Sequence, residues 1–405
     1  MKTLSANDAV ETGYKTRGVF QKMVFKVLKD LHHGHLTIVD GGRKYLFGHD
    51  KTLQATIVVH DSSFYRDIAL GGSIGAGEAY MMGSWDSPDL TSVIRIMARN
   101  IHLTQALDGG LALLTAPFKK WYHLKNKNSQ RQSKLNIARH YDLGNEFFKE
   151  FLDPTMAYSS GIFNDQAISM EQASVAKFER ICQQIDLQRD DHLIEIGTGW
   201  GGFAIYAAQT YGCKVTTTTI SEEQYALSKQ RIEELGLESQ ITLLKDDYRL
   251  LAGQFDKLVS IEMIEAVGWE YLDTYFDTCR RLLKPKGKAC IQAITINDDR
   301  YDAARKSVDF IQRYIFPGGF LPSVGAISSH SAKNSLRLVD YFDFGQCYAE
   351  TLRRWREDFS RRIDTIKQLG MNDTFIRMWL FYFCYCEGGF DEKTIGVGHF
   401  TFEAI

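Results

Sequence analysis

The chain has 405 residues, of which 44% are hydrophobic and 24% are charged, as is typical of globular proteins. At about 150 residues per domain, this length predicts two or three domains. The formal net charge of −2 excludes a strongly basic nucleic-acid-binding chain, and 33 glycines with 6 prolines exclude collagen-like and proline-rich sequences. We therefore expect a multidomain globular protein without a nucleic-acid partner.

The sequence contains no apparent targeting segment and no run of apolar residues long enough to span a bilayer. The 7 cysteines are scattered, with no Cys-x-x-Cys and no Cys/His spacing typical of a zinc site. We expect reduced thiols, no bound metal and a cytoplasmic location.

Residues 1–117 predict a small N-terminal α+β domain associated with lipid or substrate. Apolar residues recur at helical spacing between Phe20 and Leu31, and strand-like alternation follows at 35–39 and 53–59. The predicted helix either packs on its own domain or meets a membrane surface with its apolar face.

Residues 118–136 form the clearest break in composition and predict an interdomain linker. This stretch has six cations and no acidic residue: Lys119, Lys120, Lys125, Lys127, Arg131 and Lys134. The cations are either simply solvated or attracted to anionic headgroups, at about 1 kcal/mol per cation near the surface.

From residue 137 to residue 405, strands and helices alternate. The predicted strands are 193–196, 213–219, 241–244, 257–261 and 290–296, and the predicted helices include 203–211 and 221–235. This alternation predicts an α/β fold with a doubly wound, Rossmann-like sheet.

The stretch 193–202 (LIEIGTGWGG) ends a predicted strand and opens a helix, with glycines at 197, 199 and 201. The spacing does not match the Gly-x-Gly-x-x-Gly of a NAD site, and no Lys-Ser/Thr follows as in a P-loop. With Glu195 near the strand end, it is similar to the first motif of S-adenosylmethionine methyltransferases; a glycine-rich turn without a ligand is the alternative.

From residue 137 onward the sequence resembles the cyclopropane-fatty-acyl-phospholipid synthase family, whereas residues 1–117 resemble that family's N-terminal domain only loosely. The matching stretches are HYDLGNEFF (140–148), LDPTMAYSSGIF (152–163), the glycine stretch, TISEEQ (219–224), DYR (247–249), SIEMIEAVG (260–268), RYIFPGGFLPSV (313–324) and YAETLRRWREDF (348–359). The resemblance implies a methyltransferase sheet with helical additions that bind an acyl chain.

The resemblance also implies residue roles. The residues implied at the S-adenosylmethionine site are Tyr158, Ser159, Gly197, Gly199, Thr219, Gln224, Asp247 and Tyr248. Glu265 and Tyr348 are implied around a bound bicarbonate, together with Ser160 and Gln292.

Three positions depart from the well-studied bacterial members of the family, which carry Cys, His and His where this chain has Ser160, Ala266 and Gln292. Ser and Gln can donate hydrogen bonds but do not titrate near neutral pH. With Glu262 and 316–319 (FPGG), these residues are closer to the plant-type branch. These departures leave open whether bicarbonate binds and which product forms. They affect the expectation of methyl transfer less.

The implied reaction is methyl transfer from S-adenosylmethionine to the cis double bond of an unsaturated acyl chain in a membrane phospholipid. The resulting carbocation needs exclusion of water, and aromatic faces stabilise it. The aromatic stretch 378–385 serves this purpose or packs as helix core. A base then removes a proton: loss from the added methyl closes a cyclopropane, and loss from a neighbouring carbon is expected to give a methylene or a methylated alkene. Glu265 is assigned near that base, where it either acts through bicarbonate or holds a hydrogen-bond network with Tyr348.

Two other classes of protein remain open from the sequence alone: a methyltransferase for a small polar metabolite, and a lipid-binding protein with a degenerate site. For the family interpretation we expect peripheral association with the membrane surface, and a homodimer remains open.

Overall fold

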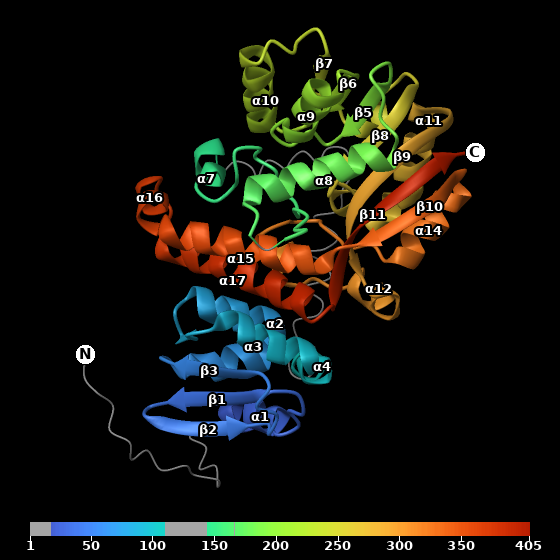
Figure 1. Ribbon diagram of the computed structural model, residues 1–405. Coiled ribbons are helices and arrows are strands. Elements are labelled where there is room, and N and C mark those ends of the chain that lie inside the picture. The colour runs from blue at the N-terminus through green and yellow to red at the C-terminus, as the bar shows by residue number, and fades with distance from the viewer. Residues whose placement is uncertain (1–17, 110–143, 166) are drawn as a thin grey trace. The chain divides into compact units, whose positions relative to one another are not determined.

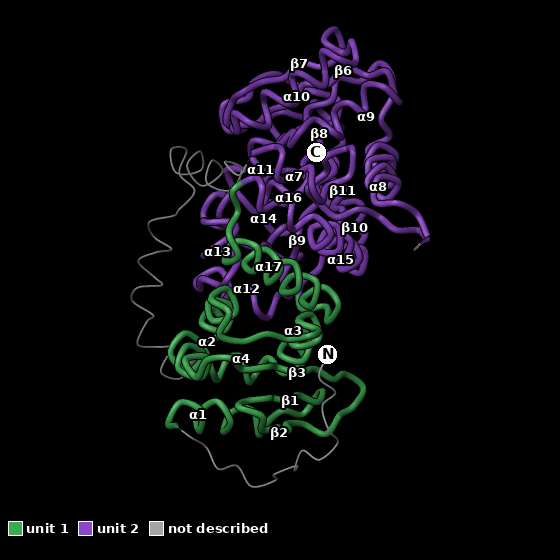
Figure 2. The backbone as a smooth tube through the Cα atoms, turned by 90° about the vertical axis from the view of Figure 1, so that its left-hand side faces the viewer, with its two compact units in different colours: residues 1–122, 370–394 green, residues 123–369, 395–405 purple. Residues whose placement is uncertain are grey.

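The computed structural model describes residues 18–109, 144–165 and 167–405 (Figure 1). The chain forms two compact units, which Figure 2 shows in different colours. Unit 1 consists of residues 1–122 and 370–394, and unit 2 consists of residues 123–369 and 395–405. The linker expected at 118–136 lies outside the described residues.

Unit 1 has the α+β character predicted for the N-terminal segment. Its elements are α1 (Val19–Leu28), β1 (His35–Asp40), β2 (Arg43–Phe47), β3 (Gln54–Val59), α2 (Ser63–Met81), β4 (Trp85–Asp86), α3 (Leu90–Arg99), α4 (Ile101–Gly109) and α17 (Asp373–Asp391). The sheet order is β2-β1-β3-β4, with β1 antiparallel to β2 and parallel to β3. Gly41 and Gly42, both at positive φ, make the tight turn of the β1–β2 hairpin.

The apolar face of α1 is used inside unit 1. Val24, Phe25 and Leu28 are buried, and the Phe25 ring contacts the rings of Tyr45 and Phe47. Burial against the sheet accounts for the helical periodicity, so the alternative of a membrane-facing apolar stripe is not supported.

Helix α17 carries the aromatic stretch 378–385 and packs on α2 and α3 of unit 1. Its buried rings are those of Trp379, Phe381, Tyr382 and Phe383. Arg95 and Arg99 of α3 each donate to Glu392 at 2.7 Å, just beyond the end of α17. Core packing in unit 1 therefore explains this stretch. The sequence did not predict that residues 370–394 belong to a different unit from their neighbours.

Unit 2 contains the predicted alternation of strands and helices. Its elements are α7 (Asn145–Lys149), α8 (Met170–Gln184), β5 (His192–Ile196), α9 (Gly202–Tyr211), β6 (Lys214–Thr218), α10 (Glu222–Glu234), β7 (Ile241–Leu244), η2 (Tyr248–Leu250), β8 (Phe255–Ile261), η3 (Ile264–Ala266), η4 (Trp269–Tyr271), α11 (Leu272–Leu282), β9 (Leu283–Ile296), α12 (Asp298–Ala304), α13 (Phe310–Tyr314), α14 (Val324–Lys333), β10 (Leu336–Asp343), α15 (Gly345–Arg361), α16 (Ile363–Gln368) and β11 (Ile395–Ala404).

The seven-stranded sheet has the order β10-β11-β9-β8-β5-β6-β7. The five predicted strands pair in parallel, and the unpredicted β11 and β10 add antiparallel strands beside β9. Neighbouring residues of one strand enter different cores: Leu193 packs with α8 and α9, whereas Ile194 packs with α11 and α14. This alternation confirms a doubly wound sheet covered by helices on both faces.

The strand order reverses at β5, which has β6 on one side and β8 on the other. Ligands of open α/β sheets bind at such a reversal, outside the carboxyl ends of the strands. Gly197, Thr219 and Glu262 each follow directly or closely on one of these three strands. The fold therefore brings these predicted stretches to one edge of the sheet.

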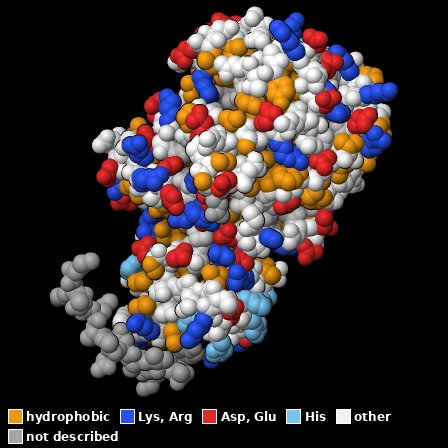
Figure 3. All heavy atoms as spheres, viewed as in Figure 1, with side chains coloured by type: hydrophobic (Ala, Val, Ile, Leu, Met, Phe, Trp, Pro, Cys, Tyr) orange, Lys and Arg blue, Asp and Glu red, His pale blue; other side chains and the backbone are white. Residues whose placement is uncertain are grey.

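Charged side chains of both signs are interspersed over the face of unit 2 drawn in Figure 3. Within the part of the chain that the structure describes, none of the helices has both the length and the apolarity required to cross a bilayer.

Candidate active site

The glycine loop after β5 has a backbone that favours glycine. Gly197, Gly199 and Gly201 have φ values of 96°, 53° and 85°. A Cβ placed on Gly199 meets no heavy atom within 4 Å, whereas one on Gly197 meets Met263 Cγ at 3.1 Å. The backbone at Gly199 is thus open to close approach by a ligand.

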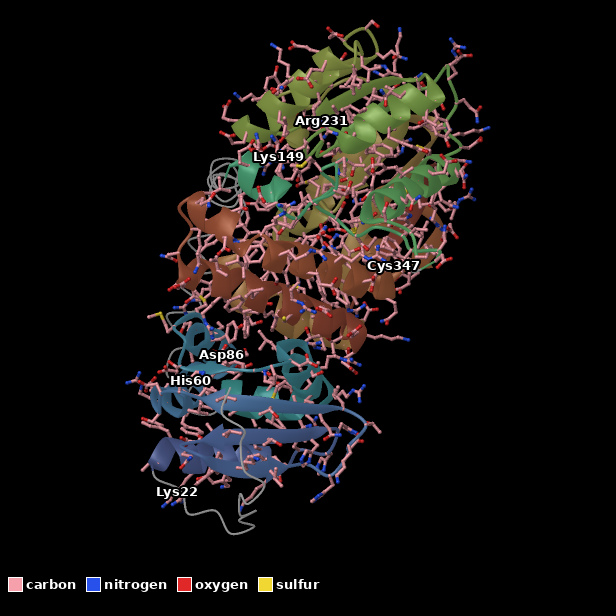
Figure 4. The ribbon with its side chains drawn as sticks, turned by 60° about the vertical axis from the view of Figure 1, so that its left-hand side comes forward. Lys22, His60, Asp86, Lys149, Arg231 and Cys347 are labelled. Atoms are coloured by element: carbon pink, nitrogen blue, oxygen red, sulfur yellow. The ribbon has the colours of Figure 1, made fainter. Side chains whose placement is uncertain are left out.

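Arg231 of α10 holds this loop against the segment that precedes α8 (Figure 4). Its Nη1 donates to the carbonyl oxygen of Trp200 at 2.6 Å and to that of Thr155 at 3.2 Å. Ser228 Oγ, on the same helix, donates to the carbonyl oxygen of Gly199 at 3.2 Å. These contacts fix the glycine loop beside the segment that carries Tyr158.

The residues predicted for the ribose end lie together. Thr219 Oγ1 donates to Gln224 Oε1 at 2.8 Å, and both side chains are buried. At the predicted adenine pocket, the Asp247 carboxylate accepts from Arg249 Nε at 2.8 Å. The buried hydroxyl of Tyr248 has no hydrogen-bond partner among the described residues, so it is available to a ligand.

At the predicted methionine end, Ser159 Oγ accepts from Lys177 Nζ at 2.6 Å. Lys177 lies on α8 and is fully buried, and burial lowers its pKa to about 8 against the attraction of Glu262, Asp153 and Glu195. The sequence analysis missed this residue, since a lysine within an amphipathic helix carries no signal of its own.

The ring of Tyr158 lies in an aromatic wall built within unit 2. Its ring centroid is 5.4 Å from that of Phe148, 5.3 Å from that of Trp355 and 6.2 Å from that of Phe316. Trp355 also lies 6.2 Å from Tyr348, edge to face. These rings are aromatic groups that unit 2 itself places beside its polar site.

Three hydrogen bonds converge on the carboxylate of Glu262. Oε1 accepts from the backbone N of Ser160 at 3.0 Å and from Gln292 Nε2 at 2.7 Å, and Oε2 accepts from the Tyr348 hydroxyl at 2.6 Å. Glu262 has a φ of 48°, unusual for a residue with a side chain. Burial raises its pKa, whereas Tyr348, Lys177 and the other donors favour the ionised form. We did not predict Glu262 as a catalytic candidate.

Glu265 has a different environment. Its Oε1 accepts from the backbone N of Ile294 at 2.6 Å, and its buried Oε2 has no partner among the described residues. Burial, and next the negative charge of Glu262, raise its pKa to about 8. At neutral pH, Glu265 therefore holds a proton, whereas Glu262, which accepts from three donors, is the carboxyl of this pair whose ionised form is better stabilised.

This assignment predicts how stability depends on pH. The pKa of Glu265 rises from 4.5 to about 8 on folding, so its contribution is fully present below pH 4.5 and is lost as pH rises through 8. Between pH 5 and 8 (a window set by that shift), we expect the melting temperature of wild type to fall relative to that of Glu265→Gln. Thermal unfolding of both proteins across this window checks the prediction, and parallel curves would contradict it.

The predicted catalytic residues other than Glu265 meet at Glu262. Tyr348 and Gln292 contact it through side chains, and Ser160 contacts it through its backbone N, because the Ser160 hydroxyl donates to the carbonyl oxygen of Gly161 at 3.0 Å. These donors have the chemistry to hold a bicarbonate, but each already donates to a carboxylate of the same shape and charge. The described residues therefore do not fit bicarbonate at these donors, and we derive no step from it.

The described residues do fit S-adenosylmethionine. The open space at Gly199, the buried pair Thr219 and Gln224 and the unmatched hydroxyl of Tyr248 follow three successive strands at one sheet edge. Open backbone and unsatisfied polar groups at the reversal of strand order are the features that a nucleoside ligand requires.

Comparisons with known proteins bear on the family to which the chain belongs. A model of the family described as "Mycolic acid cyclopropane synthetase" matches residues 128–400. The chain is 39% identical to a tuberculostearic acid methyltransferase of Mycobacterium tuberculosis, over 83% of this chain and 80% of that protein. It is 35% identical to the cyclopropane-fatty-acyl-phospholipid synthase of Escherichia coli, over 86% and 87% of the two chains.

Among solved structures, a mycolic acid cyclopropane synthase in complex with SAH and CTAB is similar with a TM-score of 0.63. It is 26% identical, and the similarity covers 67% of this chain and 98% of that one. The length of the family match and the two relatives above 30% identity establish the relationship. The chain belongs to the mycolic acid cyclopropane synthetase family, and it is an S-adenosylmethionine-dependent methyltransferase.

Proposed function

We propose that this enzyme transfers a methyl group to the cis double bond of an unsaturated fatty acyl chain in a membrane phospholipid. The observation that carries the proposal is the Glu262 carboxylate, which is held by three donors beside the aromatic wall of unit 2. An alkene substrate needs a base to remove a proton after methyl transfer, and it needs apolar walls that exclude water. The relatives named for fatty acyl and mycolic acid substrates support the same substrate class.

S-adenosylmethionine, when bound, supplies an electrophilic methyl group to the substrate. We propose that Gly199, Thr219 and Gln224 bind it, and that the Tyr158 ring, supported by Trp355, stabilises a positive charge on the acyl chain. Among the described residues, Glu262 Oε2 accepts only from Tyr348, whereas Oε1 accepts from two donors. We assign Oε2 as the atom that takes the proton.

We propose a cyclopropane as the product, in line with the Escherichia coli synthase at 35% identity. The second candidate is a methylated or methylene-bearing chain. Two observations favour it. The chain is 39% identical to a tuberculostearic acid methyltransferase. In addition, the carboxylate of Glu262 accepts the hydrogen bonds that were expected to hold bicarbonate. A cyclopropane and an exocyclic methylene both form by loss of a proton from the added methyl group. The methylene additionally requires a hydride shift that moves the cation to the methyl-bearing carbon. A methylated alkene forms by loss of a proton from a neighbouring chain carbon.

Product analysis tests the proposal. The enzyme is incubated with vesicles of mono-unsaturated phospholipid and S-adenosylmethionine whose methyl group is fully deuterated. A cyclopropane retains two deuterium atoms and has no olefinic carbon, a methylene product retains two with an olefinic carbon, and a methylated alkene retains three. Mass spectrometry and NMR of the released fatty acids distinguish these outcomes, and methyl transfer to none of the acyl chains would contradict the proposal.

We further propose that the enzyme associates peripherally with anionic membranes through the basic stretch 118–136. Replacing its first four lysines (Lys119, Lys120, Lys125 and Lys127) with Gln should weaken sedimentation with anionic vesicles, and the difference should shrink as salt rises. The matched control changes four surface lysines of unit 2 to Gln: Lys149, Lys229, Lys284 and Lys333. Equal weakening by both sets would show that net charge, not this stretch, drives binding.

A further inference from the structure

A chain of side chains leads from the helix α8 to the carboxylate of Glu262. Arg180 Nη1 lies 3.0 Å from His399 Nδ1, His399 Nε2 lies 2.9 Å from Gln292 Oε1, and Gln292 Nε2 donates to Glu262 at 2.7 Å. Strands β11 and β9 are adjacent and antiparallel (Figure 1). His399 and Gln292 are partners in the register of this pair. Both side chains are fully buried.

The direction of every hydrogen bond in this chain is set by its two ends, a guanidinium and a carboxylate. A guanidinium group has only donors, so His399 Nδ1 has to accept, and the imidazole proton has to sit on Nε2. Nε2–H then donates to an oxygen of Gln292, which leaves the amide NH2 group of Gln292 directed at Glu262. The carboxylate of Glu262, which has only acceptors when ionised, requires the same orientation of the amide from the other end of the chain.

The surroundings hold this arrangement in one state. Arg180 pairs with Asp340 at 3.3 Å and lies over the Phe342 ring, with Cζ 4.0 Å from the centroid. The Phe344 ring packs edge to face on His399 at 4.8 Å. Burial first, and then the charges of Arg180 and Lys177, lower the pKa of His399 well below its ordinary value, so the imidazole stays neutral.

We infer that His399 is a positioning residue of the reaction: in one fixed tautomer, it orients the amide of Gln292 so that the amide donates to the carboxylate of Glu262. The inference rests on the base role proposed for Glu262. It also accounts for Gln292, which stands where other members of the family carry histidine. In this chain an imidazole is present one strand away and acts through the glutamine.

A double-mutant cycle tests the inference in the full-length enzyme, with transfer of labelled methyl to mono-unsaturated phospholipid vesicles as the readout. We expect His399→Phe to lower kcat about tenfold or more, the scale of one hydrogen bond to a charged group, with KM for S-adenosylmethionine within about threefold. On the acid side, the pH at which kcat rises should move to higher values, because the Gln292 amide is no longer held in place as a donor to the ionised form of Glu262. The charged and titratable groups that face Glu262 and His399, namely Lys177, Glu265, Tyr348, Arg180 and Asp340, are unchanged in this variant.

In the Gln292→Leu background, His399→Phe should cause little further loss, because the residue acts through Gln292. His399→Gln, which keeps one donor and one acceptor, should recover kcat to within about threefold of wild type. Fully additive losses, or no shift in the pH at which kcat rises, would overturn the inference.

A measurement on the wild-type enzyme covers the case in which His399→Phe does not fold. In protein labelled with ¹⁵N-histidine, we expect one neutral imidazole that is protonated on Nε2 and does not titrate between about pH 5 and 9, around the ordinary value for histidine. A titrating signal, or an Nδ1–H tautomer, at His399 would overturn the inference. If Glu262→Gln loses activity but the losses in the double-mutant cycle are additive, the positioning role of His399 is refuted and the base role of Glu262 stands. If Glu262→Gln keeps full activity, the base role of Glu262 is refuted.

Discussion

Glu262→Gln is expected to lower kcat by about 100-fold to 10,000-fold, the range for loss of a positioned acid–base group. The amide keeps the size of the side chain and loses the negative charge that accepts from Tyr348, Gln292 and the backbone of Ser160. The cofactor contacts proposed at Gly199 and Thr219 involve other strands, so the Kd for S-adenosylmethionine should stay within about threefold, or about 0.65 kcal/mol. Labelled-methyl transfer at saturating cofactor measures kcat, and calorimetry measures Kd.

Glu265→Gln is the matched variant, because it makes the same change three residues away. Glu265 has a pKa of about 8 and holds its proton at neutral pH, so an amide reproduces its uncharged form. We expect this variant to lose less kcat than Glu262→Gln at pH 7. From the sequence we expected Glu265 near the base, and a larger loss in Glu265→Gln than in Glu262→Gln would support Glu265 as the acid–base group instead.

The pH profile adds a second criterion. Because burial raises the pKa of Glu262, the base becomes available only as pH rises through that raised value, and wild-type kcat should increase with pH on the acid side. The Glu262→Gln variant should lack this rise of kcat with pH. If kcat rose over the same pH range in both proteins, the titration would belong to another group.

The parts of the fold that follow from local sequence were predictable. The glycine loop needs three positive-φ residues within five positions, and Ser221 caps α10 by accepting from the backbone N of Gln224 at 3.3 Å. Each of these features depends on residues that are close in the chain, so their spacing is visible in the sequence.

The features that the sequence did not predict depend on pairing between distant segments. His399 reaches Gln292 only because β11 returns to pair with β9, and 107 positions separate the two residues. Lys177 reaches Ser159 only through the burial of α8 against the site. The chain leaves unit 2 after residue 369 and returns to it at residue 395. The aromatic residues of α17, in between, therefore belong to unit 1 although their neighbours in the sequence belong to unit 2. Composition and periodicity carry no information about such partners.

Gly199→Val is expected to weaken binding of S-adenosylmethionine about 100-fold or more. Gly199 has a φ of 53°, and the space where its Cβ would lie is open to 4 Å. A β-branched side chain would fill the space in which the backbone approaches a ligand, and it would strain a left-handed conformation by about 1–3 kcal/mol. Calorimetric titration with S-adenosylmethionine measures the affinity, and the melting temperature measures the strain.

Gly236→Val separates these two effects. Gly236 has a φ of 65°, and a Cβ placed there also meets no atom within 4 Å, but it lies in the turn after α10 rather than in the glycine loop. Both substitutions impose similar backbone strain, so both should lower the melting temperature. Only Gly199→Val should lose affinity, since only that position faces the predicted cofactor. If the two variants bound S-adenosylmethionine with the same affinity, the glycine loop would be a tight turn and not part of the cofactor site.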